Sequence, residues 1–209
     1  MRPQVAWARP PMHLGFGAAL AGGAGLLLVE PSGFLIVRVV AEGLALFFCL
    51  RGVEVVALFA VLAVTLVSFT GHGSSSAGTV LLDAVHAVSA AAWAGGILAL
   101  ATLRPPGGWR SDEARTLVER WERAAVIAFV VTALTGLLRA SEQLNGWSDL
   151  WTTSYGEVLA VKVIAVGVML AISVAWRRGR PRPRADAAVA IVVIGATALL
   201  AAFPVEPHG

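Results

Sequence analysis

Hydrophobic residues fill seven long runs that are separated by short polar segments. The runs cover residues 12–29, 34–50, 53–69, 80–103, 124–138, 157–176 and 185–203. A helix needs roughly 20 apolar residues to cross the hydrocarbon core of a bilayer, and most of these runs are near that length. The pattern predicts an all-α polytopic membrane protein, a bundle of about seven transmembrane helices. No polar segment is long enough to fold separately, so we expect residues 1–209 to form a single transmembrane domain.

The first run follows two arginines, as the apolar part of a signal peptide does, but its length and the spans directly after it favour a membrane helix.

The longest polar insert, residues 103–123, contains Pro-Pro-Gly-Gly, which ends a helix, and then Ser111-Asp112-Glu113, which is typical of a helix N-terminus. We expect residues 111–123 to form a short charged helix at the membrane surface, separate from the fifth span.

Composition agrees with a membrane protein and excludes several other classes. Hydrophobic residues make up 57% of the chain and charged residues only 14%, where a soluble domain carries about a quarter. The net charge of +3 does not indicate a nucleic-acid partner, because the arginines lie in loops between apolar runs. The single cysteine, Cys49, excludes an intramolecular disulfide and any CxxC motif. No hydrolase motif or phosphate-binding loop is present, so we do not expect an enzyme.

Arginine placement predicts the orientation of the seven spans. A cytoplasmic N-terminus puts thirteen arginines in cytoplasmic segments and only Arg139 in an extracytoplasmic one. Positive residues in short loops favour the cytoplasmic side, so we expect the N-terminus inside and the C-terminus outside. The protein is then expected to be a multi-pass membrane protein. The loop with His72 and the loop with Trp147 and Tyr155 both face outward.

Several ionisable residues fall within the outer halves of the spans. A charge in the membrane costs at least about 2.5 kcal/mol on insertion scales, so such groups should face one another and not lipid. We expect an outward-opening polar pocket, formed with Trp93 and Tyr155 by the ionisable residues Arg38, Glu42, Asp83, His86 and Lys162. Simpler alternatives exist: an i,i+4 ion pair between Arg38 and Glu42, a snorkelling Lys162, and an Asp83 that favours the positive end of its helix.

The stretch from Thr70 to Gly96 carries the candidate metal ligands. Asp83, His86 and Trp93 form one stripe on a helix, and His72 lies between glycines in the loop before it. Two imidazoles and a carboxylate are suited to divalent copper or zinc. We therefore expect His72, Asp83 and His86 to form an outward-facing metal site, although a histidine in a membrane helix can equally well hydrogen-bond across helices.

The same stretch resembles the copper-resistance D (CopD/PcoD) family. GHGSSSAGTVLLDAVHAVSAAAWAGG resembles the part of the family in which a GH loop precedes D-x-x-H and W-x-G-G. LWTTSYGEVLAVKVIAV resembles the family's T-x-Y-G-x-x-L-x-x-K signature. The resemblance covers residues 69–204 and depends on the order of these pieces.

The resemblance implies a multi-pass copper transport or copper tolerance protein of the bacterial inner (cytoplasmic) membrane that works with a periplasmic copper carrier. His72, Asp83 and His86 would be its metal residues, and Tyr155, Gly156 and Lys162 its sixth-span signature. Below the polar pocket, Cys49 and Met169 have the soft sulfur chemistry that suits Cu(I), although the simpler interpretation is that both are ordinary apolar fillers.

Two other functions remain as alternatives. A b-type haem or redox assembly protein would need histidines from two helices at matching depth, whereas only His86 lies well inside a predicted span. A metal-free subunit would dock a periplasmic protein through the aromatic loop around Trp147 and Trp151.

Overall fold

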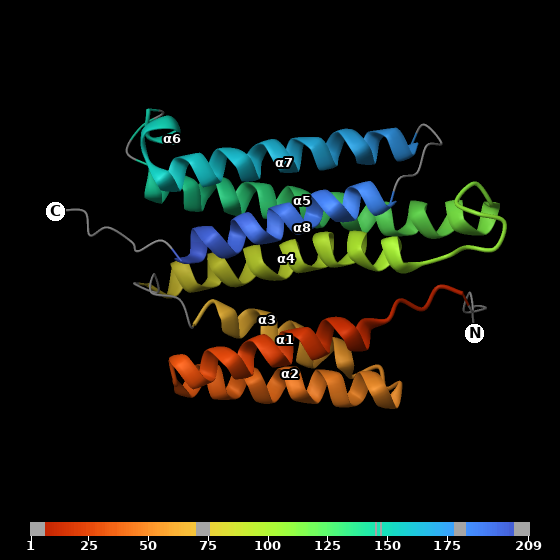
Figure 1. The fold of residues 1–209 in the computed structure, drawn as a ribbon, viewed down its shortest axis with the longest axis horizontal. Coiled ribbons are helices and arrows are strands. Elements are labelled where there is room, and N and C mark those ends of the chain that lie inside the picture. The colour runs from red at the N-terminus through yellow and green to blue at the C-terminus, as the bar shows by residue number, and fades with distance from the viewer. Residues whose placement is uncertain (1–6, 70–75, 145, 147, 178–182, 203–209) are drawn as a thin grey trace. The chain divides into compact units, whose positions relative to one another are not determined.

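The computed structural model describes residues 7–69, 76–144, 146, 148–177 and 183–202. These residues form helices and, within the described ranges, no strands. The helices are α1 (Met12–Val29), α2 (Gly33–Arg51), α3 (Val56–Val67), α4 (Ala77–Thr102), α5 (Asp112–Gln143), α6 (Asp149–Thr152), α7 (Ser154–Arg177) and α8 (Pro183–Ala202) (Figure 1). The predicted all-α class is therefore confirmed.

Each predicted apolar run coincides with a helix. α1, α2, α4, α5 and α7 are long and apolar enough to cross a membrane, whereas α3 and the apolar part of α8, Ala187–Ala198, are shorter. The number of spans and their orientation remain predictions. The predicted loop between the fifth and sixth spans contains the short helix α6.

The expected separate surface helix is wrong, because residues 112–143 form one helix of 32 residues. Ser111 caps it as predicted, with its hydroxyl accepting a hydrogen bond from the Ala114 amide at 3.4 Å. No glycine or proline interrupts the chain where the charged part meets the apolar part. Buried Ala114 and Ala125 also share one face, so the same inner stripe runs through both parts.

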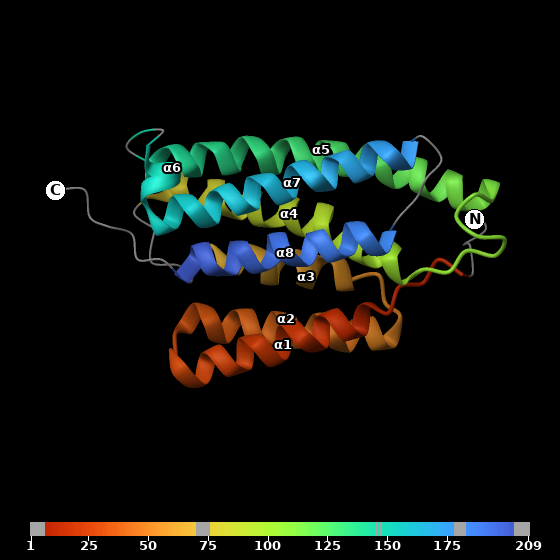
Figure 2. The same ribbon diagram turned by 45° about the horizontal axis from the view of Figure 1, so that its top comes forward.

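The chain divides into two compact units. The N-terminal unit is Pro11–Ala91, and the C-terminal unit is Ala92–Gly209 together with Met1–Pro10. In the N-terminal unit, α2 packs against both α1 and α3 (Figure 2). Gly52 ends α2 in the left-handed conformation, with φ of 67°. This ending suits glycine, which has no β-carbon to clash there.

The C-terminal unit is a bundle of α5, α7, α8 and the second half of α4. Its core is an apolar cluster drawn from all four helices: Trp93, Ile97, Ala125, Ala165, Met169, Ala190 and Val193. Most of the other side chains on these helices are exposed and apolar, as expected for surfaces that face lipid. Trp7 of the N-terminal arm also belongs to this unit, because its indole donates a hydrogen bond to Glu113 of α5 at 3.1 Å.

Candidate functional site

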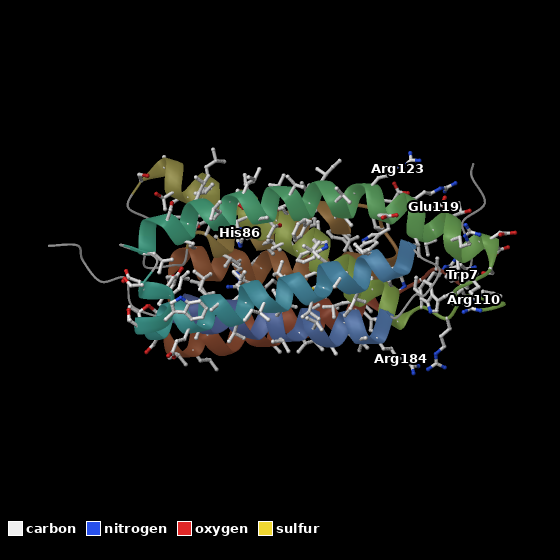
Figure 3. The ribbon with its side chains drawn as sticks, turned by 90° about the horizontal axis from the view of Figure 1, so that it is seen from above. Trp7, His86, Arg110, Glu119, Arg123 and Arg184 are labelled. Carbon is white, nitrogen blue, oxygen red and sulfur yellow. The ribbon has the colours of Figure 1, made fainter. Side chains whose placement is uncertain are left out.

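Asp83 and His86 lie less than one turn apart in the first half of α4 (Figure 3 labels His86). Both side chains are half-buried, and both take part in contacts within the structure. The spacing of three residues puts the carboxylate and the imidazole on neighbouring parts of one helix face. Oxygen and imidazole nitrogen donors held on a rigid helix suit a divalent copper or zinc ion.

The third predicted ligand, His72, lies outside the described residues. Within the described ranges, no group of three His, Cys, Asp or Glu side chains is gathered closely enough to hold a metal ion. Of the three predicted ligands the structure describes Asp83 and His86, and the metal site with His72 stays a prediction.

Arg38 and Glu42 form an ion pair along α2, with 2.9 Å between Arg38 Nε and Glu42 Oε1. This confirms the simpler alternative for these two residues. Glu42 is only 5% exposed, and its second oxygen, Oε2, has no hydrogen-bond partner among the described residues. Oε2 lies against Gly23 of α1, where a β-carbon would collide with it. The glycine thus leaves room for the carboxylate between α1 and α2.

Trp93 is a core residue of the C-terminal unit. It is 5% exposed, and its ring meets that of Phe129 edge to face with 4.9 Å between centroids. Three residues further on, Gly96 contacts the indole of Trp121, which would collide with a β-carbon there. The W-x-G-G sequence therefore packs α4 against two aromatic rings of α5. Trp93 lies in an apolar cluster, so its own surroundings do not have the polar character predicted for it.

In the T-x-Y-G sequence at the start of α7, Thr153 and Gly156 both contact α6 or its neighbouring backbone. The Thr153 hydroxyl accepts a hydrogen bond from the Gly156 amide at 3.0 Å and donates one to the Asp149 carbonyl at 2.7 Å. Gly156 is in close contact with the backbone of α6 at Asp149 and Leu150. Tyr155 is half-buried and lies within electrostatic range of Arg139.

Lys162 lies on the inner face of α7. It is half-buried, whereas Val161, Val163 and Ile164 beside it are 52%, 62% and 64% exposed. Its side chain shares this face with Met169, which is fully buried in the core cluster. Among the described residues of its own unit, no carboxylate forms an ion pair with Lys162.

The residues predicted for the polar pocket and the sulfur site lie in two different units. Arg38, Glu42, Asp83, His86 and Cys49 belong to the N-terminal unit, and Trp93, Tyr155, Lys162 and Met169 to the C-terminal unit. A common polar pocket and a Cys49–Met169 sulfur site therefore stay predictions. Met169 is packed on all sides by the apolar cluster, as expected for a filler.

Sequence reasoning missed the positions of Arg139, Gly23 and Trp121. Arg139 was counted only as a loop charge, although it follows the apolar run of α5 directly and lies within that helix. The roles of Gly23 and Trp121 depend on a partner from another helix, which no local pattern indicates.

Comparison with known proteins finds similarities over part of the chain. Residues 115–203, from the first turns of α5 to the end of α8, match the family model described as copper resistance protein D. Copper transport protein CutJ of Bacillus subtilis (strain 168) is 34% identical over 102 residues, which are 46% of this chain and 18% of that relative. The match thus spans less than a fifth of the relative's length, and no solved structure matches the chain. The part of the chain with helices α5, α7 and α8 is therefore similar to copper resistance protein D.

Proposed function

We propose that this protein handles copper in the bacterial inner membrane, as a transporter, permease or tolerance protein that binds the ion and is not an enzyme. The observation that carries the proposal is the match of residues 115–203 to the family model described as copper resistance protein D. The name of the relative, a copper transport protein, supports the same class of substrate.

The proposed entry site for copper is formed by Asp83 and His86, with His72 as a third ligand. Imidazole nitrogen has a high affinity for copper, and a nearby carboxylate offsets the charge of a divalent ion. Because both described donors are on one helix, their separation is set by the backbone of α4. His72, which precedes α4 in the sequence, would complete the set of ligands.

The proposed orientation puts this site at the extracytoplasmic side. Exposed Arg110, Arg123 and Arg184 lie at one end of the C-terminal unit (Figure 3). Such a concentration of arginine supports a cytoplasmic location for that end. Asp83 and His86 are in the part of α4 that precedes Ala92, nearer the opposite end of that helix. A periplasmic copper carrier is the proposed donor or acceptor of the ion.

Copper affinity of the purified protein tests this proposal. We expect His86→Ala to remove most of the affinity and His72→Ala to weaken it less, because a loop ligand is more easily replaced by water. His13→Ala is the matched control, since His13 is exposed at the start of α1. Acidification should release the metal, because protons compete for the imidazole nitrogens. Unchanged copper binding by the His72→Ala/His86→Ala double variant would place the site elsewhere.

A further inference from the structure

The ion pair on α2 leaves most of the Arg38 guanidinium without a hydrogen-bond partner. Its contact with Glu42 uses Nε alone, at 2.9 Å from Oε1, and no described residue accepts a hydrogen bond from either Nη. Guanidinium donors lie on Nε and on both Nη groups, so most of the N–H donors of Arg38 are unused. The second oxygen of Glu42 is also without a partner, but it is packed against Gly23. The donors of the pair that can still bind another group are therefore those of Arg38.

The Arg38 side chain emerges from an otherwise buried stripe of α2. This stripe consists of Leu35, Arg38, Glu42 and Ala45, spaced by three or four residues. Leu35, Glu42 and Ala45 are 2%, 5% and 0% exposed, whereas the side chain of Arg38 is 19% exposed. Arginine does not lose its proton in proteins, so the exposed head group stays charged. N–H donors that face hydrocarbon without an acceptor are costly, and they require oxygen atoms from outside the described chain.

Two ring stacks fix the register of α2 and α3. Phe34 stacks on Phe69 with 5.4 Å between the ring centroids. Phe48 stacks on Phe59 with 5.2 Å between the centroids, so the two helices run antiparallel. Arg38 follows Phe34 by one turn, and it is therefore level with the last turn of α3.

The position of Arg38 along α2 brings its head group within reach of lipid headgroups. Gly33 begins the helix, and the Arg38 α-carbon lies about 7–8 Å from it along the helix axis. Arginine has a long methylene stem, which extends along apolar surface and carries the charged group toward the interface. Val37 and Val40 beside Arg38 are 51% and 55% exposed, as expected for side chains that face lipid. Phosphates of the leaflet in which α2 begins are thus acceptors that the free Nη groups can reach.

We propose that Arg38 binds the phosphate of a zwitterionic phospholipid through its two Nη groups. Guanidinium and phosphate match in geometry, because parallel N–H donors meet separate phosphate oxygens. Glu42 holds the guanidinium at Nε and balances its charge. The ion pair and a zwitterionic lipid together carry no net charge, whereas an anionic lipid adds an uncompensated charge at the edge of the hydrocarbon. The site therefore fits phosphatidylethanolamine better than phosphatidylglycerol, and it requires no contact with the proposed copper ligands.

Native mass spectrometry of the full-length, delipidated protein in detergent tests this site. The protein is titrated with dilauroyl phosphatidylethanolamine, and the apparent Kd of the first bound lipid is measured. Arg38→Met/Glu42→Met removes one positive and one negative charge, so the net charge of the chain stays at +3. We expect this double variant to raise the apparent Kd about tenfold, because it removes the charge-assisted hydrogen bonds to the phosphate.

Val37→Met/Val40→Met is the matched control for this double variant. It places two methionines at the same depth on the exposed side of α2 and leaves the ion pair intact. This control should keep the wild-type affinity for the lipid. Two competitors of the wild type separate the parts of the lipid: dilauroylglycerol has the acyl chains without the phosphate, and glycerophosphoethanolamine has the phosphate without the chains. Each should compete at least about tenfold more weakly than the intact lipid.

The lipid preference of Glu42→Gln distinguishes binding from a purely structural role of the pair. Without the carboxylate, the charge of Arg38 is unbalanced, so this variant should prefer dilauroyl phosphatidylglycerol to the ethanolamine lipid. The wild type should have the opposite preference. The ratio of two Kd values is measured in one protein, so a general loss of stability does not imitate this result.

Any of three results would overturn the proposal. One is a folded Arg38→Met/Glu42→Met variant with the wild-type affinity for phosphatidylethanolamine. Another is equal competition by dilauroylglycerol or by glycerophosphoethanolamine, because the site would then recognise acyl chains alone or a soluble phosphate. The third is an unchanged lipid preference of Glu42→Gln. If the double variant does not fold, the competition experiments on the wild type decide.

Discussion

Glycines at three helix contacts are required by the groups that lie against them. Gly23 contacts the Glu42 carboxylate, Gly96 the Trp121 indole, and Gly156 the backbone of α6. A β-carbon at Gly156 would be 2.6 Å from the Leu150 α-carbon. Backbone atoms yield less than the ends of side chains, so Gly156 is the least replaceable of the three.

Gly156→Ala should therefore destabilise the protein. Overpacking typically costs about 1–3 kcal/mol, and here α6 would have to move away from α7. The measurement is thermal unfolding of the purified protein in detergent. Gly167→Ala on the same helix is the control, since nothing lies within 4 Å of its β-carbon position. Alanine favours helix by up to about 1 kcal/mol over glycine, so this control should be neutral or stabilising. Equal effects of the two substitutions would contradict the contact at Gly156.

A second prediction for single residues concerns the ion pair between Arg38 and Glu42 on α2. Arg38→Met leaves Glu42 buried without its charge partner, which typically costs about 3–5 kcal/mol. Adding Glu42→Met should recover most of that loss, because replacing both partners by apolar groups is often neutral. Unfolding by denaturant of the two variants and the wild type measures this difference. A double variant less stable than Arg38→Met would show that the pair does not act as a unit.

At the scale of helices, α5 is the element that differs most from expectation. Its 32 residues correspond to about 48 Å, which exceeds the roughly 30 Å hydrocarbon core of a bilayer. The charged first third is therefore a rigid extension of a span. Trp121 in this part fills the space at Gly96, and Glu113 binds the N-terminal arm through Trp7.

Proline at the junction of the two parts tests this continuity. Ala124→Pro should cost about 3 kcal/mol or more and reduce helicity, because proline removes a backbone hydrogen bond inside a continuous helix. Asp112→Pro should be tolerated much better, since proline fits the first position of a helix and Ser111 is already extended, with ψ of 150°. Circular dichroism and thermal unfolding measure both effects. Equal tolerance of the two prolines would indicate a hinge at residue 124.

Local patterns predicted the helices better than they predicted the contacts between them. The seven apolar runs, the Ser111 cap and the Arg38–Glu42 pair depend on neighbours in sequence, and the structure contains all of them.

The continuity of α5 was missed because a charge-rich segment has the composition of a surface helix. The inner stripe of Ala114, Trp121 and Ala125 is recognised only from its partners on other helices. Trp93 was expected in a polar pocket because of its stripe with Asp83 and His86. The ring that covers it, Phe129, comes from α5 and could not be deduced from spacing.

For the whole molecule, the orientation in the membrane is the first property to measure. Reporter fusions at Gly52 and Gly108 should be cytoplasmic, and fusions at Pro31 and Gly146 extracytoplasmic, because the arginine-rich segments stay inside. A reporter such as alkaline phosphatase, which is active only outside the cytoplasm, distinguishes the two sides. Any exchange between the two pairs would overturn the seven-span arrangement.

The length of α3 sets a condition on the lipid around the protein. Its 12 residues span about 18 Å, well below the hydrocarbon thickness of an average bilayer. The chain before it continues in turns, with the Val56 amide bonded to the Val53 carbonyl at 3.3 Å. A bilayer accommodates such a short segment by thinning locally, at a cost that rises with each ångström of mismatch. We therefore expect the protein to unfold at higher temperature in vesicles of short-chain phosphatidylcholine than in long-chain ones at equal headgroup composition. An acyl-chain preference of this kind would make membrane thickness itself a determinant of where in a cell membrane the protein accumulates.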